Sequence, residues 1–406
     1  MRRLVGRIRP YAWGSRTGIA AVQGRTPSGG PEAELWFGAH PDDPSPVIDG
    51  AAQRSLLDMI DADPDSVLGS EVVDRYGPRL PFLLKVLAAE RPLSLQVHPD
   101  SDQARDGFAA EEAAGVPRDA PYRNYVDPYH KPELLLAVTE FDALCGFRTA
   151  ARSADALRRL GVPELESVAD ALGSAPPEAG LRQAVTALFA LPVGGGLIGR
   201  VRDACVRHAA GPDAPPEYAL AADLAARYPD DVGVLVSFLL NRVRLRPGEA
   251  IFMPAGGPHT YLRGLGLEVM AASDNVLRGG LTPKHVDVDE LLRTLRYEEL
   301  PDPRVPAVPL AVDPGAGGDV VWWPTPMPDF RLTRAVVRSG QLRLPVPGPG
   351  PRIVFCLKGQ VRVGDTVDEA VLTGGEAVFV AAAAGPLTVA GDGEVYQASL
   401  GGRSDR

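Results

Sequence analysis

Leu245-Arg-Pro-Gly-Glu-Ala-Ile-Phe-Met-Pro-Ala255 is the stretch that decides the fold, because it recurs as Leu372-Thr-Gly-Gly-Glu-Ala-Val-Phe-Val-Ala-Ala382. Both copies have the form Leu-x-x-Gly-Glu-Ala, in which a glycine-containing turn leads directly into a short apolar strand. Internal repetition of this kind indicates a duplicated structural unit. We therefore expect two β-units, one around each copy.

The surrounding sequence extends this pattern. Four short apolar strands bounded by Gly, Pro and Asp are predicted in the first 150 residues: Glu34–Gly38, Pro81–Leu87, Leu93–Val97 and Glu133–Val138. Many short strands, glycine-rich turns and a duplicated unit are typical of jelly-roll or cupin-type barrels. From about residue 151 to 240, Ala and Leu dominate and stretches such as Leu181–Phe189 have the apolar spacing of helices.

The predicted fold class is therefore mainly β, with two cupin-type (jelly-roll) β-barrel domains and an inserted α-helical domain. The first barrel is expected to comprise residues 1–150 plus 241–300, the helical insertion residues 151–240, and the C-terminal cupin-like domain residues 301–406. When the two repeat copies are aligned, Pro386 falls opposite His259, and the strands around Arg352–Val363 contain no histidine. We therefore expect the C-terminal domain to have no metal site and to contribute structure rather than chemistry.

Bulk composition limits the class of partner. The chain has 406 residues and a formal net charge of −10, so it is a poor candidate for binding nucleic acid or an anionic membrane. Its three cysteines, Cys145, Cys205 and Cys356, are widely scattered, which argues against a disulfide framework and a thiolate metal site. No apolar run is long enough for a membrane span, and we expect a cytoplasmic protein, as a monomer.

The segment Pro92-Leu-Ser-Leu-Gln-Val-His-Pro99 carries the strongest chemical signal. Gln96 and His98 are two residues apart in an apolar run, so on a strand their side chains point to the same face. Such a pair is either polar decoration of a half-solvated face or part of a cation site, since Gln oxygen and His nitrogen both bind divalent metals. Two further donors, Glu133 in His130-Lys-Pro-Glu133 and His259 in Met253–Tyr261, favour the second reading.

Charged side chains crowd the same segments: Lys85, Lys131, Glu268, Asp274, Arg278 and Lys284. Each of them alone would be interpreted as an ordinary solvated residue, except Lys85, whose neighbours are apolar on both sides. A metal surrounded by cations and carboxylates suits a sugar phosphate, because the metal can polarise a carbonyl while the cations bind the phosphoryl group.

A family resemblance rests on six ordered motifs between residues 11 and 284. They are Tyr11-Ala-Trp-Gly14, Glu34-Leu-Trp-Phe-Gly-Ala-His-Pro41, Leu93-Ser-Leu-Gln-Val-His-Pro-Asp100, His130-Lys-Pro-Glu133, Pro254-Ala-Gly-Gly-Pro-His-Thr-Tyr261 and Ser273-Asp-Asn-Val-Leu-Arg-Gly-Gly-Leu-Thr-Pro-Lys284. Together they resemble the type I mannose-6-phosphate isomerases (phosphomannose isomerases), a zinc-dependent cupin family.

The resemblance implies one Zn²⁺ per chain with Gln96, His98, Glu133 and His259 as ligands, and Arg278 as the catalytic arginine. It places Lys131, His130, Glu268 and Asp274 at further catalytic positions, and Ser94, Lys85 and Lys284 near the substrate. The implied reaction interconverts mannose 6-phosphate and fructose 6-phosphate through a cis-enediolate, as part of mannose supply for GDP-mannose synthesis. Lys131, His130 and Glu268 all remain open as the proton-transfer base.

Two alternatives stand beside this reading. A cupin dioxygenase would hold iron with two histidines and one carboxylate, but Gln96 and the cluster of Lys and Arg argue against it. A non-catalytic sugar-binding double cupin would tolerate loss of the ligands or of Arg278, and all of them are present.

Overall fold

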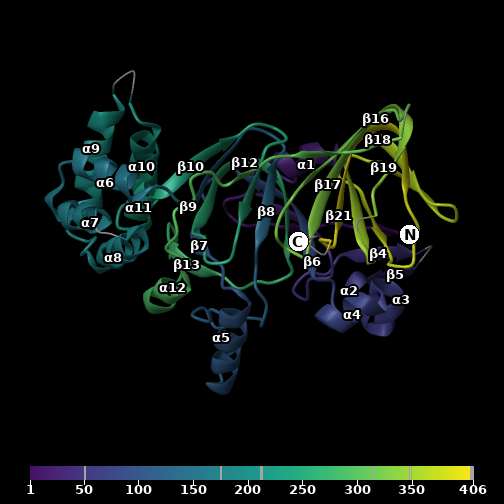
Figure 1. Cartoon of the computed structure of the whole chain (residues 1–406), viewed down its shortest axis with the longest axis horizontal. Helices are drawn as coiled ribbons and strands as arrows, with labels where there is room; N and C mark the ends of the chain where they lie inside the picture. Colours follow the sequence, from purple (N-terminus) through teal and green to yellow (C-terminus); the bar gives the residue numbers. More distant parts are fainter. Residues whose placement is uncertain are drawn as a thin grey trace.

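The computed structural model describes residues 1–402 apart from Gly50, Ala51, Ser174, Ala175, Gly211, Pro212, Asp213, Pro314, Pro347 and Pro349. The molecule is elongated, with a bundle of helices at one end, strands in the middle and the C-terminal strands at the other end (Figure 1). No helix in the described part of the chain is long and apolar enough to cross a bilayer.

An 11-stranded sheet system occupies the middle of the molecule, and the 13-residue strand β12 is its hub. β12 pairs antiparallel with β6, β7, β8 and β9, which brings segments far apart in sequence onto one surface. The strands of this sheet system are β2 (Arg7–Arg9), β3 (Glu34–Phe37), β6 (Phe82–Ala89), β7 (Leu95–Val97), β8 (Glu133–Ala137), β9 (Phe141–Phe147), β10 (Leu240–Leu245), β11 (Ala250–Met253), β12 (His259–Ala271), β13 (Leu277–Gly280) and β14 (Arg304–Val305).

A 10-stranded sheet contains the C-terminal strands together with three strands from the first 55 residues. β1 pairs with β20, so the N-terminal segment joins the C-terminal sheet, whereas the sequence prediction assigned it to the first barrel. The strands are β1 (Arg2–Leu4), β4 (Pro46–Asp49), β5 (Ala52–Ser55), β15 (Val308–Leu310), β16 (Gly318–Trp323), β17 (Arg331–Arg343), β18 (Arg352–Gly364), β19 (Glu369–Thr373), β20 (Ala377–Val380) and β21 (Thr388–Ser399).

The two repeat copies occupy equivalent roles in the two sheets. Each Gly-Glu turn leads into a buried four-residue strand, β11 in the first sheet and β20 in the second. A shared apolar core joins the sheets, and Phe37 packs against Phe355 across it with ring centroids 5.3 Å apart. The C-terminal sheet is therefore packed directly against the sheet that carries the predicted site.

Helices fill the chain between β9 and β10 and share an apolar core with strand residues such as Leu95, Leu144 and Leu277. They are α6 (Ala150–Arg159), η1 (Pro163–Leu165), α7 (Glu166–Leu172), α8 (Pro177–Ala190), α9 (Leu197–Ala209), α10 (Pro216–Arg227), α11 (Gly233–Val236) and η2 (Ser237–Leu239). The buried residues of α8, among them Leu181, Ala184, Val185 and Leu188, have the helical spacing read from the sequence.

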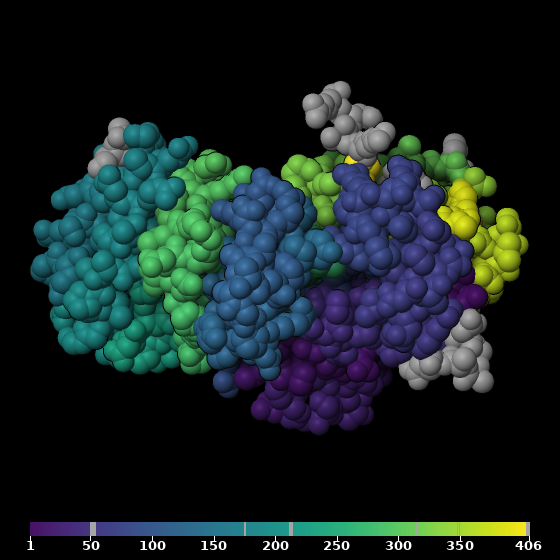
Figure 2. All heavy atoms as spheres, turned by 90° about the horizontal axis from the view of Figure 1, so that it is seen from below, coloured from purple at the N-terminus to yellow at the C-terminus, as the bar shows by residue number. Residues whose placement is uncertain are grey.

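Other helices lie outside this bundle: α1 (Gly18–Val22), α2 (Leu56–Ala62), α3 (Pro64–Leu68), α4 (Ser70–Tyr76), α5 (Ser101–Ala113) and α12 (Val288–Thr294). The sequence reading treated residues 1–150 mainly as strands, although α2 and α5 both begin with a capping box, at Ser55 and Asp100. In the space-filling view, the blue segment that contains α5 stands between the helical end and the C-terminal end (Figure 2).

Candidate metal centre and active site

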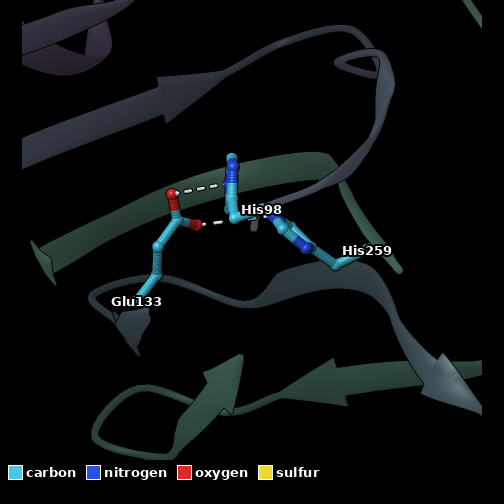
Figure 3. Close-up of side chains that lie close together, drawn as sticks. All are labelled: His98, Glu133 and His259. Atoms are coloured by element: carbon cyan, nitrogen blue, oxygen red, sulfur yellow. Dashed lines mark ion pairs between the residues drawn. The ribbon is translucent and has the colours of Figure 1, made fainter. Parts of the chain in front are cut away.

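Three of the four predicted metal ligands converge in the middle sheet: His98 just after β7, Glu133 at the start of β8 and His259 at the start of β12 (Figure 3). His98 Nε2 lies 3.1 Å from Glu133 Oε1, and His259 Nε2 lies 3.4 Å from Glu133 Oε2. All three residues are at most 3% exposed. Each adjoins a proline (Pro99, Pro132 and Pro258), which restricts the backbone that holds it.

The hydrogen bonds of the two imidazoles prepare them for a cation. His98 Nδ1 lies 2.7 Å from the carbonyl oxygen of Asn275, and His259 Nδ1 lies 3.1 Å from that of Gly257. A carbonyl oxygen only accepts, so Nδ1 of each ring carries the proton and Nε2 presents its lone pair. His98 Nε2 is buried without a hydrogen bond. Two lone pairs facing a buried carboxylate fit a divalent cation, because without one they would repel each other.

Strand register places the fourth predicted ligand, Gln96, beside this group. Gln96 is the direct cross-strand partner of His259 on one side and of Arg278 on the other. Side chains of directly paired residues point to the same face of a sheet. Gln96, His259 and Arg278 therefore form a row across β12, β7 and β13, and half-buried Ser94 lies just before β7 begins.

Burial of His98 and the charges around Glu133 lower the pKa of these two ligands. Burial lowers the pKa of His98 to about 4, and the nearby Lys131 adds to this. Burial alone would raise the pKa of Glu133, but His98, His259 and Lys131 outweigh it and hold that pKa well below its usual range. Lys131 Nζ lies 3.6 Å from Glu133 Oε1. His98 is therefore neutral and Glu133 ionised near neutral pH.

A second buried network lies deeper, around Lys85 and Glu268, which are cross-strand partners on β6 and β12. Lys85 Nζ lies 3.4 Å from Glu268 Oε2 and 4.0 Å from Glu34 Oε2. Burial opposes the charge on Lys85, but the two carboxylates outweigh burial and raise its pKa. For Glu268, burial and the charge of Glu133 raise the pKa to about 7.

Tyr261 connects this network to the metal ligands, because its hydroxyl lies 2.8 Å from Glu268 Oε1 and 3.3 Å from Glu133 Oε2. The sequence reading did not single out Tyr261, although its position two residues after His259 on a strand places both on one face.

The segment Ser273–Lys284 forms one side of the site. Asp274 is paired with His40, whose Nε2 lies 3.2 Å from its Oδ2, so His40 belongs to the site although it was not predicted as a ligand. Asn275 and Ser273 are tied to Asp127 by hydrogen bonds, which fixes the loop that also holds His98.

Arg278 and Lys284 differ from the other cations of the site. Arg278 is half-buried and Lys284 is exposed, and neither side chain has an ion pair within the part of the chain that the structure describes. Burial and the charge of Arg278 lower the pKa of Lys284, so the two cations lie within electrostatic range of each other. Two neighbouring cations without a carboxylate are a natural receptor for an anion.

His130 contacts the loop that leads into the C-terminal strand β17. Its Nε2 lies 3.1 Å from Asp329 Oδ1, in the loop before β17. No sequence signal pointed to Asp329, because it is 199 residues away from His130. The predicted candidates are thus brought together, with His130 at the boundary between the two sheets.

A separate cavity of about 1200 Å³ is lined by residues such as Arg16, Arg246 and Arg263 and contains none of the candidate site residues.

Comparisons with known proteins agree with the geometry. The family described as phosphomannose isomerase type I, catalytic domain, matches residues 1–150. The mannose-6-phosphate isomerase of Escherichia coli is 38% identical over 399 residues, covering 97% of this chain and 98% of that protein. The enzyme of Schizosaccharomyces pombe is 33% identical over 429 residues, with 98% and 99% covered.

Solved structures give the same answer. The mannose 6-phosphate isomerase of Salmonella typhimurium, bound to fructose 6-phosphate and zinc, superposes with a TM-score of 0.88 at 34% identity, covering 99% of each chain. A zinc-bound mannose 6-phosphate isomerase superposes with a TM-score of 0.87 at 34% identity, covering 98% of this chain and 99% of that one. The resemblance read from the six motifs is thereby confirmed, and the chain belongs to the type I mannose-6-phosphate isomerase family.

Proposed function

We propose that this chain interconverts mannose 6-phosphate and fructose 6-phosphate and uses one Zn²⁺ held by Gln96, His98, Glu133 and His259. The observation that carries the proposal is the buried pair of imidazoles whose Nε2 lone pairs face Glu133. Full-length relatives with this activity, one of them solved with fructose 6-phosphate and zinc, support it. Bound zinc would supply a positive charge that polarises the substrate carbonyl.

Accessibility separates the groups that can reach a substrate from those that act behind it. The side chains of Glu268 and Lys85 are 3% and 7% exposed, whereas those of His130 and Asp274 are 22% and 29% exposed. Both oxygens of Glu268 already face partners, Tyr261 and Lys85. We therefore assign Glu268 and Lys85 to holding the charge balance beneath the substrate.

Proton transfer then falls to the accessible groups. Aldose–ketose isomerisation moves one proton between C1 and C2 and a second proton between oxygens. We assign His130 to accept and return a proton, with Asp274 as a carboxylate on the facing loop. Lys131, the adjacent amine, is only 8% exposed and pairs with Glu133, so we group it with the buried charges. Arg278 would stabilise the negative charge of the enediolate.

We assign the phosphate to Lys284, with Arg278 nearby. Lys85 and Lys131 are both engaged by carboxylates at 3.4 and 3.6 Å, which leaves less positive charge free for a dianion. Lys284 has no such partner within the described residues, and it lies on the exposed end of the loop that begins at Ser273. Ser94, beside Gln96, would hydrogen-bond the sugar.

A coupled assay on mannose 6-phosphate tests the proposal. Chelated protein should lose activity and regain it with one equivalent of zinc, because the reaction depends on the metal. His98→Ala should lose both metal and activity, whereas His208→Ala, in the helical bundle, should lose neither. Full activity in metal-free protein would refute the metal-dependent mechanism. Iron in active protein would favour the dioxygenase alternative, since two histidines and one carboxylate also bind iron.

We further propose that both sheet systems are cupin-type barrels, with no metal in residues 301–406. The boundaries given by the sequence analysis are kept except that β1, β4 and β5 join the C-terminal sheet and β14 joins the middle one. The β11 and β20 strands support this, because each follows the same turn motif. A cytoplasmic location is supported by the three free, buried cysteines. A monomeric state remains our proposal and is checked by light scattering.

A further inference from the structure

A side chain from the C-terminal part of the chain, Asp329, reaches the candidate active site. This residue lies in the loop between β16 and β17, and its Oδ1 is 3.1 Å from Nε2 of His130. The Asp329 residue is only 3% exposed. A buried carboxylate that contacts an accessible histidine is the arrangement by which proteins orient an imidazole for proton transfer.

Asp329 has few other partners, which makes the contact with His130 its principal one. Its second oxygen, Oδ2, is buried without a hydrogen bond in the described part of the chain, and so is the hydroxyl of nearby Tyr76. An ionised carboxylate only accepts hydrogen bonds, so Nε2 of His130 must carry the proton. Nδ1 of the neutral ring then presents its lone pair, and this is the atom free to accept a proton from a substrate.

Both partners are fixed by their neighbours. On the side of Asp329, Phe330 is fully buried in the core between the sheets, and Gly401 donates its backbone N–H to the carbonyl oxygen of Pro328. A substitution at Gly401 would place a Cβ 2.2 Å from the carbonyl oxygen of Met327, so this packing is close. The loop therefore presents Asp329 at a defined position.

On the side of His130, hydrogen bonds hold the backbone before and after the ring. The carbonyl oxygen of Tyr129 accepts from Ser273 Oγ and Asn275 Nδ2, and that of Pro132 accepts from the N–H of Ala271. These donors belong to the segment that also carries Asp274. The imidazole is thus clamped between the two sheets, while 22% of its side chain stays exposed.

We infer that Asp329 is a positioning residue of the isomerase, which fixes the tautomer and orientation of His130 from the C-terminal sheet. The inference rests on the role proposed above for His130. It departs from the sequence-based expectation that residues 301–406 contribute structure alone. The second sheet completes the site by supplying the one carboxylate that His130 contacts.

Steady-state kinetics of Asp329→Asn and Asp329→Ala, with zinc content measured in each, test the inference. The Asn variant keeps the shape and removes the charge, whereas the Ala variant removes the contact. We expect kcat to fall by at least about tenfold, as part of the 10²- to 10⁴-fold that general acid–base catalysis contributes. KM and zinc content should stay near the wild-type values. Asp319→Asn, at an exposed carboxylate of the same sheet that pairs with Arg338, is the matched control and should be unchanged.

A double-mutant cycle separates positioning from folding. In a His130→Gln background, Asp329→Asn should cause no further loss of kcat, because its effect passes through His130. Selective ¹⁵N labelling of the six histidines gives a second measure, in which the Nε2–H tautomer of His130 should lose population in Asp329→Ala. Neither result is expected if Asp329 only supports the fold.

The outcomes that overturn the inference are distinct from those that overturn the proposed function. Full kcat in His130→Gln would refute the role proposed for His130 and the inference with it. An impaired His130→Gln together with wild-type kcat in both Asp329 variants would refute the inference alone. An Asp329 effect that persists unchanged in the His130→Gln background would also refute it.

Discussion

Replacement of Lys85 by Met should destabilise the protein strongly, because it leaves two buried carboxylates without their cation. Lys85 Nζ lies 3.4 Å from Glu268 and 4.0 Å from Glu34, and the Lys85 residue is 5% exposed. At an effective dielectric constant of about 20, each attraction amounts to about 4–5 kcal/mol before desolvation is counted. Breaking a buried pair on one side costs about 3–5 kcal/mol in measured cases, and we expect a loss in that range.

The loss should depend on pH, because a carboxyl group can take up a proton when its cation is removed. The pKa of Glu268 is already raised to about 7, above its unfolded value, so its folded form binds a proton more tightly. Stability linked to such a group falls as pH rises between the unfolded and folded pKa. Without Lys85 the folded pKa rises further, so the difference between Lys85→Met and wild type should be larger at about pH 8.5 than at about pH 5.5.

Urea unfolding of zinc-saturated protein at the two pH values measures this. Lys358→Met is the control: Lys358 Nζ is closer to its carboxylate, at 2.8 Å from Glu394, but its side chain is 71% exposed. An exposed pair contributes at most about 1 kcal/mol, so burial rather than distance should decide. A second replacement, Glu268→Gln in the Lys85→Met background, should recover part of the loss. Equal costs for the two lysines, or a pH-independent cost, would refute the reasoning.

Three further predictions follow from the site and the fold. Zinc should stay bound during dialysis at about pH 6, because burial lowers the pKa of His98 to about 4 and the bound metal competes further with the proton for Nε2. Elemental analysis checks this, and loss of zinc at about pH 6 would contradict it. Arg278→Ala should lower kcat far more than it raises KM, whereas Lys284→Ala should chiefly raise KM and weaken the salt dependence of KM. Steady-state kinetics at two ionic strengths measure both constants. The same changes in kcat and KM in the two variants would exclude these separate roles. Gly359→Ala should lower the free energy of unfolding by about 1–3 kcal/mol, because Gly359 has φ +82° and the new Cβ would lie 2.2 Å from the carbonyl oxygen of Asp392. Gly24→Ala, at φ +60° with no atom within 4 Å of the new Cβ, should lower it less. Equal losses in urea unfolding would show that the close contact at Gly359 does not matter.

The sequence predicted the convergence of His98, Glu133 and His259 because these residues lie in short local motifs. Gln96 and His98 share one segment, and Glu133 and His259 each adjoin a proline, so residue type and spacing were informative without knowledge of the fold. The repeat likewise predicted two β-units. Tyr261 could also have been predicted as a site residue, because it lies two residues after His259 and therefore on the same face of the strand.

Contacts between segments far apart in the chain could not be predicted from the sequence. The pairing of β1 with β20, the contact of His40 with Asp274 and that of His130 with Asp329 join residues separated by hundreds of positions, and no local pattern encodes them. The helices α2 and α5 are a different case. Their capping boxes at Ser55 and Asp100 are local signals, and the emphasis on strands in this region obscured them.

The distribution of charge explains how a chain of net charge −10 can receive a dianionic sugar phosphate. In the interior, cations and carboxylates balance: Lys85 faces Glu268, and Lys131 faces Glu133. Towards solvent, Arg278 and Lys284 have no carboxylate partner among the described residues, so these two neighbouring cations can attract an anion despite the overall charge. The buried pairs thus fix the charge of the metal ligands, and the unpaired cations remain available for the substrate.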